Sequence, residues 1–253
     1  MIIDAHMHLG ECRIFDSDVT EQALTDGLDR NGVDAAIVQP FPGAPDPRAV
    51  HDRIANLAVK HPGRIFGLAS LSPHCDQDVY YKEVERCVHD LGFVAVKLHT
   101  IGHAVNPLHR DGELVFATAA ALGVPVMVHT GPGVPFALPS LTLRGAKKYP
   151  DTPVVLAHAG ALIYTQEAMV TAEMADNIYL ETSWIGPPMI GMVIRRLGPE
   201  RVMFGSDLLP NIPTELLKYR TIGLSDEVLD ATMQGTAAKV FRLPLPSQPS
   251  SAH

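Results

Sequence analysis

Short apolar segments alternate along the chain with longer segments whose apolar residues recur at helical spacing. Eight short segments have the apolar or β-branched composition of strands, and seven amphipathic segments between them predict helices. The first predicted helix spans residues 21–32, after Thr20 as its N-cap. Strands that alternate with helices predict a parallel sheet with right-handed crossovers. The eight predicted strands are MIIDAHMHL, VDAAIVQP, RIFGLASL, FVAVKLHT, VPVMVHTG, PVVLAHAG, NIYLETSW and RVMFGSD.

The predicted strands are almost continuously apolar, which indicates a sheet buried on both faces. Eight strand–helix units in 253 residues favour a closed barrel, because a (β/α)8 barrel takes about 250 residues. An open doubly wound sheet normally has a glycine-rich turn after its first strand, whereas HLGECRIF follows here. We therefore predict a single α/β domain, a (β/α)8 TIM barrel over residues 1–243, and a flexible Pro/Ser-rich tail over residues 244–253.

Charge and cysteine content restrict the partners and the compartment. The chain has 20 basic and 28 acidic residues, a net charge of −8, and no basic run, which argues against nucleic acid and membrane partners. Its three cysteines form no CxxC pair and predict neither a disulfide framework nor a thiolate zinc site. Without a signal segment or a long apolar run, we expect a cytoplasmic protein that acts on a small molecule; a homo-oligomer remains open.

Histidine and aspartate recur where the predicted strands end, which is where parallel barrels collect their chemistry. His6 and His8 are two residues apart and therefore share one face of the first strand. His129, His158 and Asp207 follow apolar runs at the matching position of three later strands. Neutral imidazole and carboxylate groups suit zinc, manganese or iron. The HxH pair alone is weak evidence, but its repetition across strands predicts a metal site.

Four further polar or aromatic residues near strand ends are candidates for the site. Lys97 and His99 share one strand face, and His99 lines the pocket or contacts a loop. Glu181 is a candidate acceptor for a histidine N–H. Trp184 forms a pocket wall or packs locally. We predict that all four are substrate-binding residues.

Five motifs in order, DAHMHLG, GFVAVKLHT, VPVMVHTG, VVLAHAG and RVMFGSDLLP, resemble the amidohydrolase superfamily. The similarity is strongest to the amidohydrolase-related branch, which includes the aminocarboxymuconate-semialdehyde decarboxylase and dicarboxylate lactonase types. It extends from Ile2 to about Leu243, where MQGTAAKVFRL resembles the closing helix of that branch.

The resemblance implies a role for each matching residue. It implies that Asp207 binds or faces the metal and moves protons, and that His158 is an acid/base or carbonyl-polarising group. In two-metal members a carboxylated lysine bridges the ions from the position of Lys97, whereas in the single-metal branch that lysine is not a bridge. We expect one divalent metal, zinc first, with manganese or iron as alternatives and a binuclear site less favoured. The implied metal ligands are His6, His8, His129 and Asp207.

Two reactions fit such a site. The first is hydrolysis of an amide, lactone or ester bond in a small carboxylated substrate by metal-activated water. The alternative is metal-dependent non-oxidative decarboxylation at the same residues. The short chain favours hydrolysis, because the resemblance implies longer loops in decarboxylases. A TatD-type nuclease is disfavoured by the lack of basic patches and by Lys97, and a non-catalytic barrel is disfavoured by the intact ligand set.

Overall fold

The computed structural model describes residues 1–244, so residues 245–253 of the predicted tail lie outside the described residues. Eight strands run parallel in chain order, and a short antiparallel strand, β2 (Ser17–Val19), pairs with the end of the first. The parallel strands are β1 (Ile3–Cys12), β3 (Ala35–Pro40), β4 (Ile65–Ala69), β5 (Ala95–Leu98), β6 (Val126–His129), β7 (Val154–Ala157), β8 (Ile178–Glu181) and β9 (Val202–Met203).

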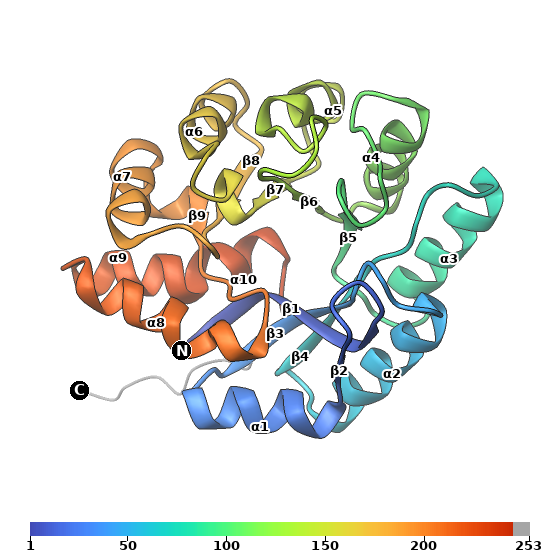
Figure 1. The fold of residues 1–253 in the computed structure, drawn as a ribbon, viewed down its shortest axis with the longest axis horizontal. Helices are drawn as coiled ribbons and strands as arrows, with labels where there is room; N and C mark the ends of the chain where they lie inside the picture. The colour runs from blue at the N-terminus through green and yellow to red at the C-terminus, as the bar shows by residue number, and fades with distance from the viewer. Residues whose placement is uncertain (245–253) are drawn as a thin grey trace.

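Most of the helices follow the strands and lie around the outside of the curved sheet (Figure 1). Each predicted strand and each predicted helix has a counterpart in the structure. The α-helices are α1 (Glu21–Asn31), α2 (Pro47–Lys60), α3 (Gln77–His89), α4 (Arg110–Leu122), α5 (Leu143–Lys148), α6 (Thr165–Glu173), α7 (Pro187–Leu197), α8 (Ile212–Thr221), α9 (Asp226–Asp230) and α10 (Thr236–Val240).

Local sequence explains where the first helix begins and ends. The Thr20 side chain accepts the backbone N–H of Ala23, as an N-cap does, and Gly32 ends the helix at a φ of 66°. The prediction missed β2, α8 and α9. α8 carries a proline in its first turn, which is a start signal, but its apolar residues are too few to show a clear helical period.

The two faces of the sheet belong to two cores. Alternate strand residues such as Val38 and Val128 pack against the surrounding helices in the larger core. The other face, with Ile37 and Met127 among its residues, forms a smaller core that α10 completes through Val240. Because side chains alternate along a strand, the residues that follow this inner set at the strand ends also face inward.

The first and last parallel strands meet without forming a ladder among the described residues. Two backbone hydrogen bonds join them: Ala5 donates to Phe204 O at 3.1 Å, and Asp207 donates to His6 O at 2.8 Å. The expected α/β class and parallel strand order are confirmed, whereas regular pairing around a closed eight-stranded barrel is not present at this junction. Within residues 1–244, no helix is long and apolar enough to span a membrane.

Candidate active site

A β-bulge in β1 turns His6 and His8 toward the inner side of the sheet. The register between β1 and β3 shifts between Asp4 and Met7, and Met7 packs in the outer core. The buried Asp4 carboxylate accepts the backbone N–H groups of His6 and Ser206, each at 3.0 Å, and burial raises the pKa of Asp4 to about 7. Asp4 therefore fixes the backbone beneath the two imidazoles and does not itself contact their rings.

The hydrogen bonds of His6 and His8 expose the same nitrogen of each ring. His6 donates its Nδ1–H to Glu181 Oε2 at 3.0 Å, and His8 donates its Nδ1–H to the Pro40 carbonyl at 3.2 Å. Each Nε2 then carries a lone pair, and these atoms lie 3.4 Å and 3.2 Å from Asp207 Oδ1. Ligands held about 2.1 Å from one ion are separated by roughly 3.0–3.4 Å, so this donor set fits a divalent metal.

Three residues of the site have left-handed backbone conformations, which residues other than glycine rarely adopt. The φ angles are 68° at His158, 67° at Trp184 and 67° at Asp207. A hydrogen bond holds each of the three N–H groups: His158 donates to Glu181 Oε2 at 3.1 Å, Trp184 to Glu215 Oε1 at 3.1 Å, and Asp207 to His6 O at 2.8 Å. Such strain is typical of positions that orient functional side chains.

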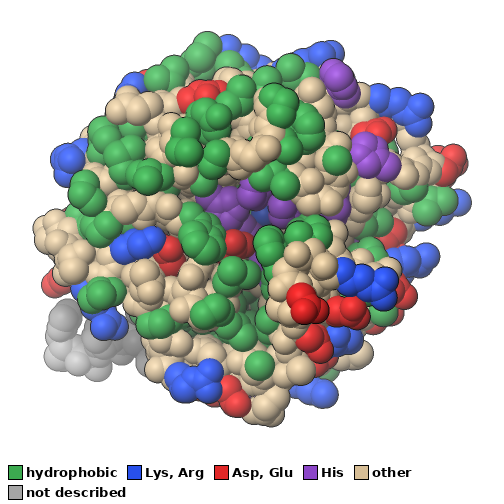
Figure 2. All heavy atoms as spheres, viewed as in Figure 1, with side chains coloured by type: hydrophobic (Ala, Val, Ile, Leu, Met, Phe, Trp, Pro, Cys, Tyr) green, Lys and Arg blue, Asp and Glu red, His purple; other side chains and the backbone are tan. Residues whose placement is uncertain are grey.

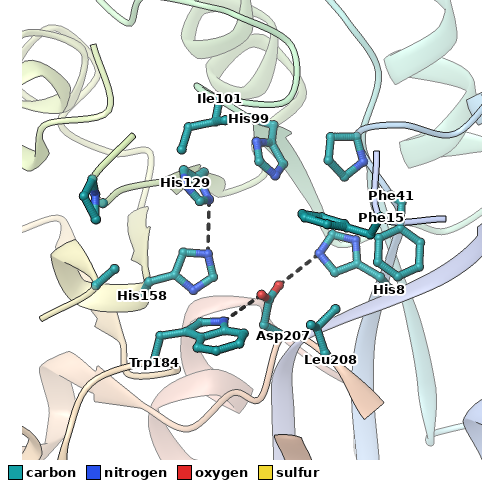
Figure 3. Close-up of a pocket in the computed structure, with 14 residues that line it drawn as sticks. His8, Phe15, Phe41, His99, Ile101, His129, His158, Trp184, Asp207 and Leu208 are labelled. Atoms are coloured by element: carbon teal, nitrogen blue, oxygen red, sulfur yellow. Dashed lines mark hydrogen bonds and ion pairs between the residues drawn. The ribbon is translucent and has the colours of Figure 1, made fainter. Parts of the chain in front are cut away.

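Four side chains form one chain of hydrogen bonds, in the order Glu181, Ser183, His158 and His129. Figure 3 shows its last bond, between His158 and His129. The Ser183 hydroxyl donates to Glu181 Oε2 at 2.9 Å, so its oxygen accepts the Nδ1–H of His158 at 2.8 Å. The bare Nε2 of His158 accepts the Nδ1–H of His129 at 3.1 Å. Nε2 of His129 is thus left without a hydrogen, as metal ligation requires.

Burial controls the charges at this site. The pKa of His158 is lowered to about 4, mainly by burial, although Asp207 opposes the shift. Burial would raise the pKa of Asp207, but the neighbouring His6 and His158 hold it well below its usual range. Burial also lowers the pKa of His6 and of His129 well below the usual value. These two neutral imidazoles and the ionised Asp207 have the protonation states that metal ligands need.

Lys97 lies beneath the cavity with its side chain almost completely buried. Its Nζ is 3.0 Å from Nε2 of His6, the same nitrogen that faces Asp207. Burial lowers the pKa of Lys97 to about 8, even though Asp207 and Glu181 favour the charged form. The amine consequently competes with a metal for the His6 lone pair, and it is not among the residues that line the cavity.

A cavity of about 360 Å³ opens above these groups, and Figure 2 shows the histidines at its floor with apolar side chains around its mouth. Of the candidate substrate-binding residues, His99 and Trp184 line it, whereas Lys97 and Glu181 lie below. His99 stacks on His129 with ring centroids 4.6 Å apart. Its Nδ1 accepts the Gly102 N–H at 3.0 Å, so its Nε2 carries the hydrogen and can donate to a ligand.

The predicted metal ligands do not all lie equally close to one another. Ligand atoms of His6, His8 and Asp207 lie within 4.8 Å of one another, whereas His129 is outside that group and contacts His158 and His99. All of the predicted histidines and Asp207 nevertheless occur at one end of the sheet. The ligand roles themselves stay a prediction.

Sequence reasoning missed Gln39 and Phe41, which follow the second parallel strand. Gln39 pairs in register with His8, and its Nε2 lies 3.3 Å from Nε2 of His8. Phe41 stacks on His8 with ring centroids 4.6 Å apart. Their place at the carboxyl end of VDAAIVQP was the available signal, but neither residue is a histidine or a carboxylate, so the metal-ligand pattern did not include them.

A second group of potential ligands, His51, Glu83 and Cys87, is built as a structural network. His51 Nε2 accepts the Ser70 N–H at 3.0 Å, so Nδ1 carries the hydrogen and donates it to Glu83 at 3.0 Å. The Glu83 carboxylate also accepts from Arg86. These bonds occupy the atoms that a metal would need, so this group does not resemble a metal centre.

The amidohydrolase family model matches residues 3–243 of the chain. The chain belongs to the amidohydrolase family. This assignment confirms the resemblance inferred from the five sequence motifs.

Relatives of known description include enzymes of two reaction types. A gamma-resorcylate decarboxylase from Polaromonas sp. (strain JS666) is 24% identical over 249 residues, which cover 78% of this chain and 76% of that enzyme. The structure of a dihydroxybenzoic acid decarboxylase from Polaromonas sp. JS666, with bound manganese and the inhibitor 2-nitroresorcinol, has a TM-score of 0.76 at 18% identity, covering 97% and 98% of the two chains.

A proposed 2-pyrone-4,6-dicarboxylic acid hydrolase from Pseudomonas putida is similar in structure to about the same degree. Its TM-score is 0.75 at 16% identity, covering 97% of this chain and 98% of that protein. At these identities the structural matches establish the fold that the proteins share. The proteins similar to this chain thus include decarboxylases and a proposed hydrolase.

Proposed function

We propose that this amidohydrolase-family protein is a divalent-metal-dependent, non-oxidative decarboxylase that acts on a small apolar carboxylic acid. The single observation that carries the proposal is the composition of the cavity. Among the described residues that line it, none is lysine or arginine, and the polar groups are His8, His99, His129, His158 and Asp207 at its floor, with the Trp184 indole beside them.

This distribution of charge favours a substrate whose only carboxylate is also the reacting group. A dicarboxylate of the lactonase type needs a second cationic contact away from the reacting bond, and the apolar walls offer none. Phe15, Phe41, Ile101 and Leu208 suit a planar or aliphatic hydrocarbon body instead. Hydrolysis, which the short chain favoured, therefore has weaker support than decarboxylation. The gamma-resorcylate decarboxylase relative points in the same direction.

The residues divide into a metal-holding set and a proton-transferring set. His6, His8, His129 and Asp207 would hold the metal. The metal supplies positive charge that binds and orients the substrate carboxylate. Manganese is the first ion to test because the related dihydroxybenzoic acid decarboxylase holds it, with zinc and iron as alternatives. We propose one metal, with Lys97 as an uncarboxylated amine.

The chemical step breaks the bond between the carboxylate and its neighbouring carbon. The electron pair of that bond stays on the substrate carbon, which takes up a proton, and carbon dioxide leaves. His158 lines the cavity, and its Nδ1–H is bonded to Ser183. Its bare Nε2 would therefore take up a proton from solvent and pass this proton to the carbon. His99 would donate its Nε2–H to a substrate oxygen, and the Phe41 and Trp184 rings would exclude water.

A screen of small carboxylic acids and lactones with the manganese-loaded protein tests the proposal. We expect carbon dioxide release from a monocarboxylic acid by the wild-type protein and at least a thousandfold loss in Asp207→Asn. His89→Asn, at an exposed site on α3, serves as the matched control for the preparation. Hydrolysis of a lactone or ester without carbon dioxide release would reject decarboxylation and support the hydrolase function.

A further inference from the structure

The chain contains one tryptophan, and its indole contacts the candidate metal ligand Asp207 directly. Trp184 Nε1–H donates to Asp207 Oδ2 at 2.8 Å (Figure 3). The other oxygen of the same carboxylate, Oδ1, faces Nε2 of His6 and His8. The two oxygens of Asp207 therefore have separate partners, one from the indole and one from the histidine pair.

We propose that Trp184 is a positioning residue that fixes the rotation of the Asp207 carboxylate and thereby sets the affinity of the metal centre. Without the indole donor, the carboxylate of Asp207 is free to turn about its Cβ–Cγ bond and to present Oδ1 and Oδ2 interchangeably. The observed bond selects one orientation before any ion arrives. This preorganisation strengthens ligand binding because less rotational freedom is lost on binding.

The backbone that carries the indole is held by α8, outside the cavity. Trp184 has a φ of 67°, and its N–H donates to Glu215 Oε1 at 3.1 Å. The Glu215 side chain is almost completely buried and also accepts from Lys218 at 2.6 Å. The contacts thus run from α8 through the loop after β8 to Asp207 after β9, and Glu215 positions the indole as the indole positions the carboxylate.

The solvent exposure of Trp184 indicates that this residue does not serve mainly to fill the hydrophobic core. About 47% of the residue is accessible to solvent, so its removal does not empty a buried core site. An exposed aromatic ring on a strained loop, with its only polar atom bonded to a ligand carboxylate, is placed for orientation more than for stability. This role rests on the proposed function to the extent that Asp207 holds the metal.

The test compares Mn²⁺ affinity between wild type and Trp184→Phe by competition with a chromophoric chelator. Phenylalanine keeps the ring and removes the donor, so we expect about tenfold weaker Mn²⁺ binding with an unchanged melting temperature of the metal-free protein. Phe15→Leu is the matched control, because Phe15 lines the same mouth without a polar contact and should leave Mn²⁺ affinity unchanged.

Two further measurements keep the outcomes distinct. In the wild type, Mn²⁺ titration should change the emission of the sole tryptophan with the same midpoint as the chelator assay. Glu215→Gln keeps the acceptor oxygen and should bind Mn²⁺ like the wild type, whereas Glu215→Leu should weaken binding. Equal Mn²⁺ affinity of wild type and Trp184→Phe would overturn the proposed role of Trp184 but would leave the metal centre supported, because both proteins would still bind Mn²⁺. A wild type that binds no Mn²⁺, Zn²⁺ or Fe²⁺ overturns both the inference and the metal centre.

Discussion

The buried amine of Lys97 lies 3.0 Å from Nε2 of His6, the nitrogen left free for a metal. Because an ammonium donates to that lone pair and repels a cation, metal binding at His6 requires the amine to move or to lose its proton. Lys97→Met should therefore raise Mn²⁺ affinity at pH 7 by about tenfold, an effect of roughly 1.4 kcal/mol. Chelator competition at several pH values measures it.

The same variant distinguishes one metal from two. A single-metal centre predicts one equivalent of metal per chain in both the wild type and Lys97→Met, by elemental analysis. If Lys97 were a carboxylated bridge, the wild type would hold two equivalents, and the variant would lose metal while the intact mass lost the increment of carbon dioxide.

Acid should destabilise the metal-free protein through its buried neutral histidines. Burial lowers the pKa of both His158 and His103 to about 4, below the ordinary histidine value of 6.5. At pH 5 the unfolded chain binds these protons and the folded chain does not, so stability is present above pH 6.5 and is lost as the pH falls toward 4. The loss is about 2 kcal/mol per residue at pH 5.

Urea unfolding of metal-free protein at pH 7.5 and pH 5 measures this acid sensitivity. His103→Asn should reduce the difference between the two pH values, whereas His89→Asn, at an exposed position on α3, should leave it unchanged. Asp4, whose pKa burial raises to about 7, opposes the loss because its folded carboxyl takes up a proton at a higher pH than in the unfolded chain. The comparison between the two variants is therefore decisive, and a pH difference in His103→Asn equal to that of the wild type would contradict the prediction.

His99 should contribute to substrate binding more than to the chemical step. His99→Phe keeps the stacking on His129 but removes the Nε2–H donor, so KM should rise about tenfold while kcat changes little, because one hydrogen bond contributes about 0.5–1.5 kcal/mol. Steady-state kinetics with an acid found in the screen provide the measurement. A drop in kcat at constant KM would instead place His99 in the proton transfer.

Ser183 should act through His158. Its hydroxyl fixes the hydrogen on His158 Nδ1, and Ser183→Ala allows the other tautomer, which puts a hydrogen on Nε2 opposite His129. We expect kcat to fall about tenfold to a hundredfold with KM nearly constant. Thr182→Ser, one residue earlier on the strand end and bonded to Tyr219, is the matched control and should keep its kcat. Equal kcat in Ser183→Ala and wild type would exclude this tautomer control.

The sequence predicted the strands and the end of the sheet that carries the site, because short continuous apolar runs and polar residues at their ends are local signals. It also paired His6 with His8 correctly on one face. It could not show that a bulge after Asp4 supplies this orientation, because a register shift depends on the neighbouring strand.

Other features of the site depend on tertiary contacts, which the sequence alone does not show. The position of Lys97 beneath the cavity and the bond between Trp184 and Asp207 join residues far apart in the chain, and no spacing rule encodes them. The hydrophobic period of α8 was too weak to predict, although α8 positions the Trp184 loop through Glu215. The cavity walls, which favour decarboxylation, come from loops whose conformations are not local properties.

The most direct test of the account follows the carboxyl carbon of the substrate. Carboxylic acids that are isotopically labelled at this carbon are incubated with the manganese-loaded protein, and the label is traced by mass spectrometry. The account predicts labelled carbon dioxide together with a product that carries a hydrogen in place of the carboxylate, and no release by Asp207→Asn. Label that stays in the organic product while an ester or lactone bond is hydrolysed would contradict it.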